Sequence, residues 1–433
     1  MKKVLSIVSV VLLGLYCVAV IVVVLSPLNP RGNGNWFCRG GDFMLRMTEI
    51  DCVMEGVNPY DVWHGDIVRR PYLPNLPYDG APRRAVEGRE GFTEEINAYA
   101  PWEYIMMMPL ALIPKRTLSW LLYFTGMMVA LFLLFLIGRS FGRRFLGCDG
   151  SSSCLVGAAP LLLTALPIYQ NFHVGNLAVP VLLAAALMTV CLNRGHDMLA
   201  GVCWAFAMLK PQLGLIFAIP LLMKRKLETC FVAAAICITL TFVASFVCNA
   251  SPLALILQTP AANTFAFMGC GTFPYSLCPY LPGDSDIVVG LVVGAVLCAW
   301  LTWTLTRAGV RDWLVLLMPA AVIGASWTYA QCYSFTMNWF FFVVLCAALV
   351  KWPRSPFVWV FGTLSAVTLT RVYNFAHYLP RVLPGIVPEI IPAESWHYHV
   401  DSLVTLAGLV TLSAFCVWLV WGKRVPRAKM IWQ

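Results

Sequence analysis

The strongest constraint on this chain is its series of long apolar segments, which cannot all be accommodated in a water-soluble protein. A bilayer is crossed by about 20 apolar residues in a helix, because every backbone polar group in lipid must be hydrogen-bonded internally. Twelve segments approach this pattern, approximately residues 5–25, 117–138, 154–170, 177–192, 198–209, 213–223, 230–248, 287–306, 313–329, 336–350, 356–373 and 400–421. The sequence therefore predicts an all-α polytopic membrane protein with about twelve transmembrane helices.

The composition excludes the other common classes of protein. Of the 433 residues, 60% are apolar and 12% are charged, whereas soluble domains have about 45–50% apolar and about 25% charged residues. These values exclude a soluble globular protein, a disordered chain and a nucleic-acid-binding module. In so apolar a chain, the formal net charge of +9 indicates orientation in a membrane, because cytoplasmic loops are enriched in lysine and arginine.

The basic loops predict the orientation of the chain. Leu5–Leu25 is read as a retained anchor, since no small-x-small cleavage site follows it. With both termini in the cytoplasm, the following basic groups also fall there: Arg139, Arg143 and Arg144; Arg194; Lys224, Arg225 and Lys226; Arg307 and Arg311; Lys351 and Arg354; Lys423, Arg424, Arg427 and Lys429. The outer loops of this single domain, residues 1–433, are then residues 27–116, 250–286 and 374–399.

Residues 198–223 are predicted to form a hairpin of two short helices, broken at Lys210-Pro211-Gln212. The alternative is one continuous span, which would reverse every later segment and place basic loops outside. An ionisable residue at such a break is costly and is usually functional. The competing interpretation is that Lys210 extends its ammonium group into water.

The first outer loop contains a predicted helix between two turn signals, with Asp42 as its N-cap and Gly56 as its C-cap. One stripe is apolar (Phe43, Met47, Ile50 and Met54), and charged residues lie elsewhere around it (Arg46, Glu49 and Asp51). This pattern is typical of a helix lying along the membrane interface. Residues 104–113 predict a second short interfacial or re-entrant helix.

Several motifs together resemble one known family. They are Gly41-Asp42-Phe43, Glu55-Gly56-Val57-Asn58-Pro59-Tyr60-Asp61, Tyr99-Ala100-Pro101, Leu199-Ala200-Gly201, Lys210-Pro211-Gln212 and Lys224-Arg225-Lys226. The pattern covers most of residues 1–230 and is similar to glycosyltransferase family 87, a family of GT-C class, polyprenyl-phosphate-mannose-dependent membrane mannosyltransferases. Relatives usually carry Gly-Gln where this chain has Gly175-Asn176. A histidine motif of relatives is also absent after Ser326-Trp327.

The resemblance implies an inverting transfer of a hexose, with mannose as the first expectation. The donor would be a polyprenyl-phosphate sugar, the acceptor a glycolipid or glycan, and the place the outer face of a bacterial inner membrane. Asp42 matches the family's catalytic base, with Asp51 and Asp61 as alternatives. Lys210, Arg371 and Arg381 are expected to hold the donor phosphate. Membrane lipids are the expected surroundings, and no metal, cofactor or nucleic acid is expected.

The sugar-binding residues are expected among polar and aromatic side chains of the same motifs and outer loops. They are Asn58, Tyr60, Tyr99, His173, Asn176, Gln212, Tyr329, Gln331 and His377. His397 and His399 with Glu394 are a weaker alternative as a metal site. Cys38 with Cys52, and Cys270 with Cys278, are close enough in sequence to form disulfides in an oxidising exterior.

Two other functions stay open from the sequence. A transporter or flippase of lipid-linked sugars would require inverted repeats with matching ionisable residues near the midplane. An enzyme like the O-antigen ligases would instead use a lipid-diphosphate oligosaccharide donor.

Overall fold

The computed structural model describes residues 2–25, 41–56, 58–60, 100–147, 150–257, 285–327, 332–370 and 395–421. Within these ranges every regular element is helical, which confirms the prediction of an all-α chain. The predicted apolar segments coincide with the following helices: α1 (Lys2–Leu25), α6 (Arg116–Leu146), α7 (Ser151–Leu163), α8 (Ala165–Val174), α9 (Ala178–Asn193), α10 (Asp197–Ala207), α11 (Pro211–Gly214), η2 (Leu215–Phe217), α12 (Ala218–Met223), α13 (Leu227–Cys248), α16 (Ser285–Arg307), α17 (Trp313–Gly324), η4 (Cys332–Asn338), α18 (Trp339–Lys351), α19 (Pro356–Thr368) and α21 (Ser395–Trp421).

Several helices have the length and composition of membrane spans. Among the described residues, five qualify: Lys3–Val22, Arg116–Leu146, Leu227–Cys248, Val289–Arg307 and Ser334–Lys351. Helices α7 and α8 meet at a bend of 59° and make a sixth if they form one broken span. The other apolar helices have 10–17 residues, fewer than the about 20 that cross a bilayer. The chain is therefore a membrane protein by its helices, while the number of twelve spans stays a prediction.

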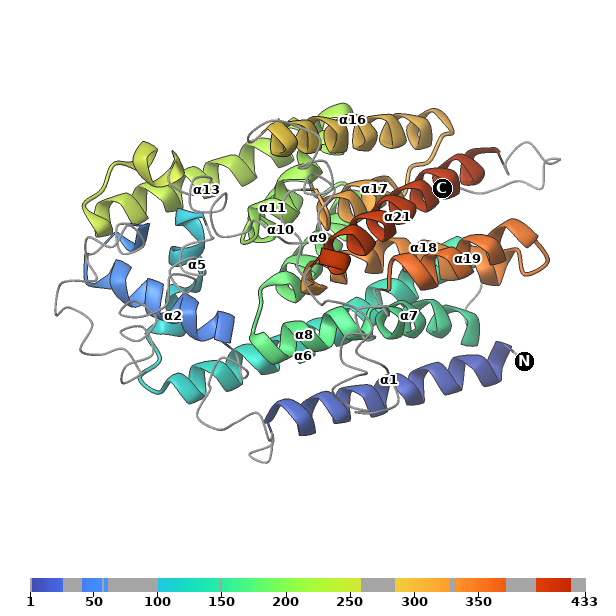
Figure 1. Cartoon of the computed structure of the whole chain (residues 1–433), viewed down its shortest axis with the longest axis horizontal. Coiled ribbons are helices and arrows are strands. Elements are labelled where there is room, and N and C mark those ends of the chain that lie inside the picture. Colours follow the sequence, from blue (N-terminus) through green and yellow to red (C-terminus); the bar gives the residue numbers. More distant parts are fainter. Residues whose placement is uncertain are drawn as a thin grey trace.

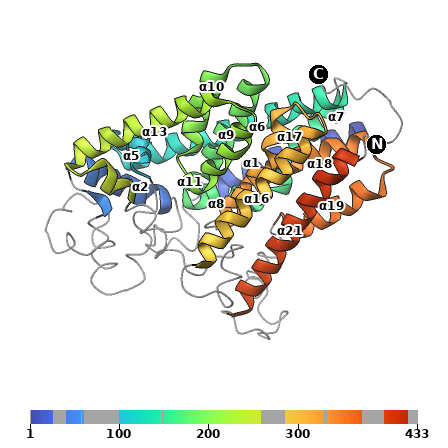
Figure 2. The same ribbon diagram turned by 90° about the horizontal axis from the view of Figure 1, so that it is seen from above.

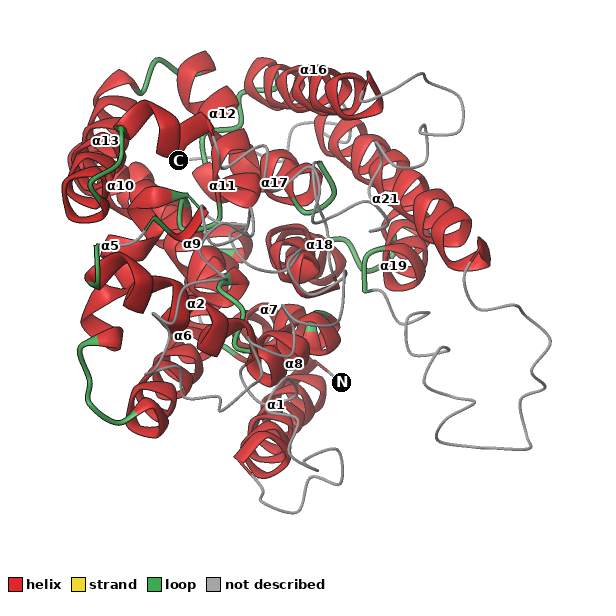
Figure 3. Ribbon diagram, turned by 60° about the vertical axis from the view of Figure 1, so that its left-hand side comes forward, coloured by secondary structure: helices red, strands yellow, loops and turns green. Residues whose placement is uncertain are grey.

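Helices α17 and α18 form the interior of the bundle. Every residue of α17 is buried, and so is every residue of α18 from Trp339 to Ala348. Helices that are apolar on all sides belong inside a helical assembly. Accordingly, α18 lies between α7, α17 and α19 (Figure 3).

Small residues allow α6 and α7 to pack closely. A Cβ atom added to Gly157 would lie 2.7 Å from the Phe135 carbonyl oxygen, and one added to Gly142 would lie 2.9 Å from the Val156 Cβ. Only glycine therefore fits at these contacts. Close backbone approach at small residues is a common packing mode of membrane helices.

One end of the bundle carries two short helices, α2 (Gly41–Met54) and α5 (Pro101–Ala111). They pack against each other and, through α5, against α13, at the left of Figure 1. The view from above shows the same grouping (Figure 2). Helix α6 starts at this end, where Arg116 forms an ion pair with Asp51 of α2. Its 31 residues extend about 46 Å at 1.5 Å per residue.

The far end of α6 lies among the basic loops. Arg144 donates to Asp312 Oδ2 (3.0 Å), and Asn193 donates to Asp312 Oδ1 (3.3 Å). Lys226 lies over the Trp313 ring, and Lys351 donates to the carbonyl oxygen of Phe145. Three of the cations predicted to share one side of the membrane, Arg144, Lys226 and Lys351, therefore meet at one end of the molecule, away from α2 and α5.

The hairpin predicted for residues 198–223 is confirmed. The Trp204 indole donates to the Gly214 carbonyl oxygen across the turn (2.9 Å). The two outer ends meet as well, because Lys226 pairs with Asp197 at 2.8 Å. The alternative of one continuous span is therefore wrong. A Cβ on Gly214 would lie 2.5 Å from the Ala207 carbonyl oxygen, so the turn itself requires glycine at this position.

Candidate functional site

Helix α2 holds the expected base in its first turn. The helix begins at Gly41, two residues earlier than an N-cap at Asp42 predicts, so Asp42 lies within it and is not its N-cap. Gly56 follows the helix with φ +76°, as the predicted C-cap requires. Three members of the predicted apolar stripe are buried (Phe43, Met47 and Ile50), whereas Met54 is exposed. Phe43 stacks on Tyr123 of α6, with ring centroids 4.9 Å apart, and this contact helps hold the start of α2 against the bundle.

Two charged residues of α2 are buried, while its placement along the membrane interface stays a prediction. Arg46 and Glu49 are 4% and 1% exposed, and they form an ion pair with each other. Charges are buried in proteins only when they are paired and hydrogen-bonded. The helix is therefore enclosed on its charged side as well as its apolar side, and it carries an internal ion pair close to Asp42.

A hydrogen-bonded chain joins the expected base to the expected phosphate ligand. Asn176 Nδ2 donates to Asp42 Oδ2 at 2.6 Å. Lys210 Nζ donates to Asn176 Oδ1 at 2.9 Å. Asp42 is half-buried, whereas Asn176 and Lys210 are fully buried. The carboxylate and the ammonium therefore lie on the two sides of one amide group, at one end of the bundle.

The local backbone determines which way the Asn176 amide points. Gly175, with φ +75°, ends α8, and Asn176 precedes α9. The Asn176 Oδ1 accepts the N–H of Ala178 (3.1 Å) as well as Lys210. Since this oxygen has two donors, the amide nitrogen must face Asp42. The Tyr123 hydroxyl donates to the Asn176 backbone oxygen (2.8 Å), which ties the turn to α6.

Lys210 is held inside the protein by the break in the hairpin. It directly precedes α11, and its carbonyl oxygen accepts the N–H groups of Leu213 and Gly214 (2.8 and 2.9 Å). Its side chain is 0% exposed. The alternative that Lys210 extends into water is therefore wrong. An ammonium group at this depth supplies a fixed positive charge beside the Asp42 carboxylate.

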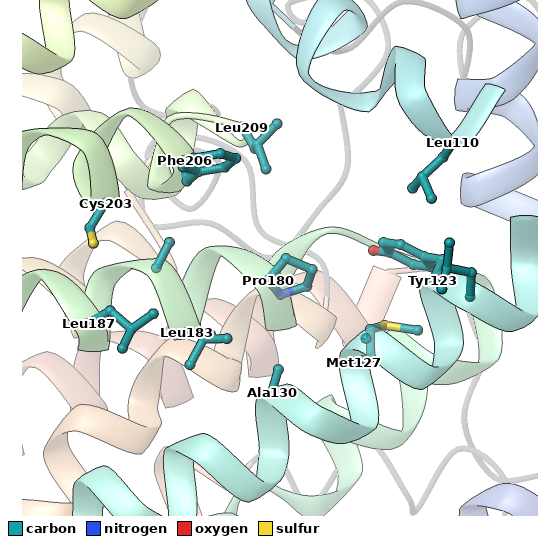
Figure 4. Close-up of a pocket in the computed structure, with 13 residues that line it drawn as sticks. Leu110, Tyr123, Met127, Ala130, Pro180, Leu183, Leu187, Cys203, Phe206 and Leu209 are labelled. Atoms are coloured by element: carbon teal, nitrogen blue, oxygen red, sulfur yellow. The ribbon is translucent and has the colours of Figure 1, made fainter. Parts of the chain in front are cut away.

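An apolar groove of about 410 Å³ adjoins this chain. Figure 4 shows Tyr123, Met127 and Ala130 on one side, Pro180, Leu183 and Leu187 on another, and Leu110, Cys203, Phe206 and Leu209 around the rest. Leu122, Gly126 and Ala184 complete the lining. The groove reaches the site at two points, because Tyr123 bonds to Asn176 and Leu209 precedes Lys210. Leu122 and Phe206 are 54% and 48% exposed, so the groove has an apolar outer rim.

Two predicted sugar ligands have structural roles. Asn58 Oδ1 accepts the N–H of Tyr60 (3.1 Å) and so closes a short turn. Tyr60 is 1% exposed and contacts Tyr104 of α5 edge-on, with ring centroids 6.2 Å apart. Their use in sugar binding stays a prediction.

The positions of the other described candidates differ. His173 is half-buried and stacks on Tyr169, with ring centroids 5.7 Å apart. Gln212 is half-buried in the short helix directly after Lys210. Asp51, an alternative base, is engaged by Arg116 through two hydrogen bonds. The Asp51–Arg116 ion pair and the His173–Tyr169 stacking are contacts separate from the chain Asp42–Asn176–Lys210.

Several predictions fall outside the described residues. Those site candidates are Tyr99, Arg371, Arg381, Tyr329, Gln331 and His377, together with the alternative base Asp61. Cys38, Cys270 and Cys278 also lie outside. Cys52 is a buried free thiol, and burial, with the nearby carboxylates, raises its pKa to about 12. The pairing of Cys52 with Cys38, which the sequence left open, falls outside the described residues.

The sequence interpretation missed Glu103 and Tyr123. Tyr123 carried no signal, because tyrosine is an ordinary residue at the end of a membrane helix. Glu103 carried one, since it is the only charged residue of the apolar helix α5, PWEYIMMMPLA. It is 1% exposed. Burial raises the pKa of its carboxyl well above the usual value, against a lowering by Arg46.

Comparison with known proteins agrees with the motifs. Residues 97–254 match the family model of glycosyltransferase family 87. The matched region runs from α5 to α13 and includes Asn176 and Lys210, while Asp42 precedes it. No curated protein and no solved structure gave a significant match. The match confirms the resemblance to this family and indicates that the chain is a glycosyltransferase.

Proposed function

Taking the chain as a glycosyltransferase related to family 87, we propose that it transfers a hexose, in the first instance mannose, from a polyprenyl-phosphate donor to a glycolipid or glycan acceptor. The transfer inverts the anomeric carbon and takes place at the outer face of a bacterial inner membrane. The observation that carries the proposal is the chain Asp42–Asn176–Lys210, which holds one carboxylate and one buried ammonium on the two sides of one amide, next to residues that line an apolar groove.

Asp42 is the proposed general base. It accepts the proton of an acceptor hydroxyl while that oxygen forms a bond to the anomeric carbon. The bond from this carbon to the phosphate oxygen breaks, and its electron pair leaves with polyprenyl phosphate. A direct displacement needs one base on the side of the incoming oxygen, and no second carboxylate as a nucleophile. The contact from Asn176 orients the carboxylate without occupying both of its oxygens.

Lys210 is the proposed ligand of the leaving phosphate. Charge develops on the phosphate as the sugar departs, and a preorganised cation in a site shielded from water stabilises such charge more than bulk water does. Lys210 is already fixed by Asn176 and enclosed by the hairpin. The proposal assigns the neutralisation of the phosphate to this side chain and needs no divalent metal.

The groove between α6, α9 and α10 is the proposed site of the polyprenyl chain. Its lining is almost wholly apolar, and it begins where Tyr123 and Leu209 adjoin the charged chain. A lipid phosphate bound at Lys210 would therefore find an apolar channel for its hydrocarbon within reach. Gly126 lines the groove, and a Cβ added there has nothing within 4 Å.

Substitution of Gly126 tests the groove. Gly126→Phe fills it without a clash at the Cβ, so KM should rise at least about tenfold for a long-chain donor, a loss of about 1.4 kcal/mol in binding. KM for a short-chain donor analogue should stay unchanged. Gly14→Phe in α1 is the matched control, because a Cβ on Gly14 also meets open space. Equal KM values of Gly126→Phe and wild type for the long-chain donor would refute this use of the groove.

The two ends of the bundle support the proposed orientation in the membrane. The basic groups that meet around Asp312 are separated from α2 by the length of α6. Since cytoplasmic loops carry the excess of lysine and arginine, the proposal assigns that end, with both termini, to the cytoplasm. The site then faces the exterior.

Replacement of the proposed base tests the reaction. The purified full chain in lipid nanodiscs is supplied with polyprenyl-phosphate-mannose and membrane glycolipids, and released polyprenyl phosphate is measured. Asp42→Asn should lower kcat by at least about 10²-fold, because a general base contributes about 10²–10⁴. The fold should be retained, since the new Oδ1 can still accept from Asn176.

Asp51→Asn, the same change nine residues later in α2, is the control and should retain turnover. Loss of activity in Asp51→Asn with full activity in Asp42→Asn would overturn the assignment of the base. Movement of the donor across the bilayer without release of polyprenyl phosphate would instead support the transporter alternative.

A further inference from the structure

Glu103 is an unusual residue for the interior of this protein. It is 1% exposed, and neither of its carboxylate oxygens has a hydrogen-bond partner among the described residues. Buried polar groups in native proteins are hydrogen-bonded in the great majority of cases. A buried hydrogen-bond acceptor or donor without a partner lowers the stability of the fold by about 1–3 kcal/mol. A group that is kept at this cost calls for a partner other than the described residues.

The location of Glu103 connects it to the site. The neighbouring Trp102 donates its indole N–H to the Met208 carbonyl oxygen (2.8 Å), two residues before Lys210. Helix α5 is therefore fastened to the hairpin turn that presents Lys210. Helix α2, which carries Asp42, packs along α5 as well. Glu103 thus lies between the two elements that hold the ends of the hydrogen-bonded chain.

The charges that act on Glu103 are those of the same site. From α2 they are Arg46, Glu49 and Asp42, and from the hairpin turn Lys210. Arg46 favours the ionised form of Glu103, but it is already paired with Glu49. Burial is the largest influence, and it raises the pKa of the carboxyl well above its usual value. Enclosure therefore favours the neutral acid form of Glu103, which has one O–H to donate.

The remaining titratable groups on the packed elements do not change this balance. Tyr104 of α5 is itself fully buried, and burial raises the pKa of its hydroxyl. Its ring packs edge-on against the ring of Tyr60. Arg116 at the start of α6 is engaged by Asp51. The last turns of α13, residues 238–248, contain no charged residue, and Cys248 is their only thiol.

The charge of the site decides which ligand atom such an acid suits. Asp42 and Glu49 are balanced by Arg46 and Lys210, so the cluster is neutral when Glu103 is protonated. A donor phosphodiester brings one negative charge. An ionised Glu103 would repel it, whereas a protonated Glu103 offers it a hydrogen bond. Hydrogen bonds to ionised acceptors are the stronger kind.

We propose that Glu103 is a binding residue for the donor phosphate: as a neutral carboxylic acid it donates its O–H to a phosphate oxygen, while Lys210 neutralises the charge. The inference rests on the proposed function and adds to it a second phosphate ligand from a helix outside the hairpin. It makes donor binding dependent on a proton, which the site holds before the donor arrives. No bond to the proton needs to break during the transfer.

This dependence has a definite sign. Below the pKa of Glu103 the acid is protonated, and affinity for the donor is constant. Above it the proton must be taken up on binding, so affinity falls by up to about tenfold per pH unit. Glu103→Gln keeps an N–H donor of the same shape but cannot ionise. Its affinity for the donor should therefore be independent of pH in this range.

The experiment measures the dissociation constants of polyprenyl-phosphate-mannose and of polyprenyl phosphate. It uses the full chain in nanodiscs over a series of pH values that extends upward from mildly acidic, because burial raises the pKa of the Glu103 carboxyl. Glu103→Gln should bind both ligands within about twofold of wild type at low pH and should not weaken at high pH, whereas wild type weakens. Glu55→Gln, at an exposed carboxyl directly after α2, is the control and should keep the wild-type profile.

Two results would overturn the inference. In one, Glu103→Gln binds the donor with the same affinity and the same pH profile as wild type, so Glu103 does not contact the phosphate. In the other, Glu103→Gln loses binding at every pH while Glu103→Asp keeps it, so an ionised carboxylate is required. Thermal unfolding of each variant shows that the chain is folded. Failure of wild type to bind the donor at any pH is a different result, because it refutes the proposed function itself.

Discussion

Replacement of Asn176 by aspartate tests the link between the proposed base and the buried ammonium. Aspartate has the size and shape of asparagine, so its Oδ1 can still accept from the Ala178 N–H and from Lys210. Its second oxygen replaces an N–H donor that now lies 2.6 Å from Asp42 Oδ2. The variant therefore keeps the helix cap and turns one attractive contact into a repulsive one.

The size of the effect follows from the short separation. Two unit charges about 4 Å apart repel by about 4 kcal/mol at an effective dielectric constant of about 20. At about 1.36 kcal/mol per pH unit, this repulsion corresponds to about three pH units. Two carboxylates this close retain a shared proton to a higher pH, and a base that carries a proton cannot accept one from the acceptor hydroxyl. The acidic limb of the pH–rate profile should therefore move upward by as much as about three units.

The assay is kcat/KM for polyprenyl-phosphate-mannose, followed across pH by the release of polyprenyl phosphate. Asn193→Asp is a matched control. Like Asn176, Asn193 accepts a backbone N–H at the start of a helix, that of Trp313 (2.9 Å), and donates to an aspartate, Asp312 (3.3 Å). Unlike Asn176, it lies at the basic end of the bundle. Its pH profile should coincide with that of wild type. Thermal unfolding of both variants checks the fold.

Two outcomes would contradict this reasoning. If Asn176→Asp keeps the wild-type kcat/KM and acidic limb, the Asn176 amide does not contact the residue that accepts the proton. If Asn193→Asp moves the limb by the same amount, the shift reports the added charge and not the contact with Asp42.

Three further predictions follow from single contacts. Gly214→Ala puts a Cβ 2.5 Å from the Ala207 carbonyl oxygen, so it should lower the free energy of unfolding by about 1–3 kcal/mol; thermal unfolding at wild-type temperature would contradict this close approach. Glu103→Gln should become more stable relative to wild type as pH rises. The reason is that a carboxyl whose pKa is raised in the folded state lowers the free energy of unfolding of wild type as pH rises from its unfolded to its folded pKa. Parallel curves of the free energy of unfolding against pH for the two proteins would argue against this. Asp51→Asn removes one charge of the ion pair with Arg116, at a cost of about 1 kcal/mol or less; a much larger loss in denaturant unfolding would show that the pair does more than fasten α2 to α6.

The apolar pattern predicted most of the fold because it acts locally. Each long apolar segment became a helix, since helical hydrogen bonds close within the segment and the side chains suit lipid or the bundle interior. The break at Lys210-Pro211-Gln212 was predictable for a similar reason, because proline cannot continue a helix from the preceding residue. The apolar stripe of α2 did not indicate that Arg46 and Glu49 are buried as a pair, because the burial of a helix's charged side depends on how the helix packs.

Part of the candidate site was accessible from residue type. Asp42 follows the first apolar segment in a motif, and Lys210 is a costly charge at a helix break. Asn176 was included only because it occupies the position of an amide in related sequences. None of these arguments showed that the three side chains meet.

The sequence by itself determined that this chain is a helical membrane protein, where its helices break, and which two charges stand out. Only the tertiary structure decided that Asn176 joins those two charges and that Glu103 is enclosed beside them without a hydrogen-bond partner in the described part of the chain. The physical reason is distance along the chain: Asp42 and Asn176 are 134 residues apart, and Asn176 and Lys210 are 34 apart. Local periodicity records which face of a helix is apolar, but the partner across that face depends on how the whole bundle packs.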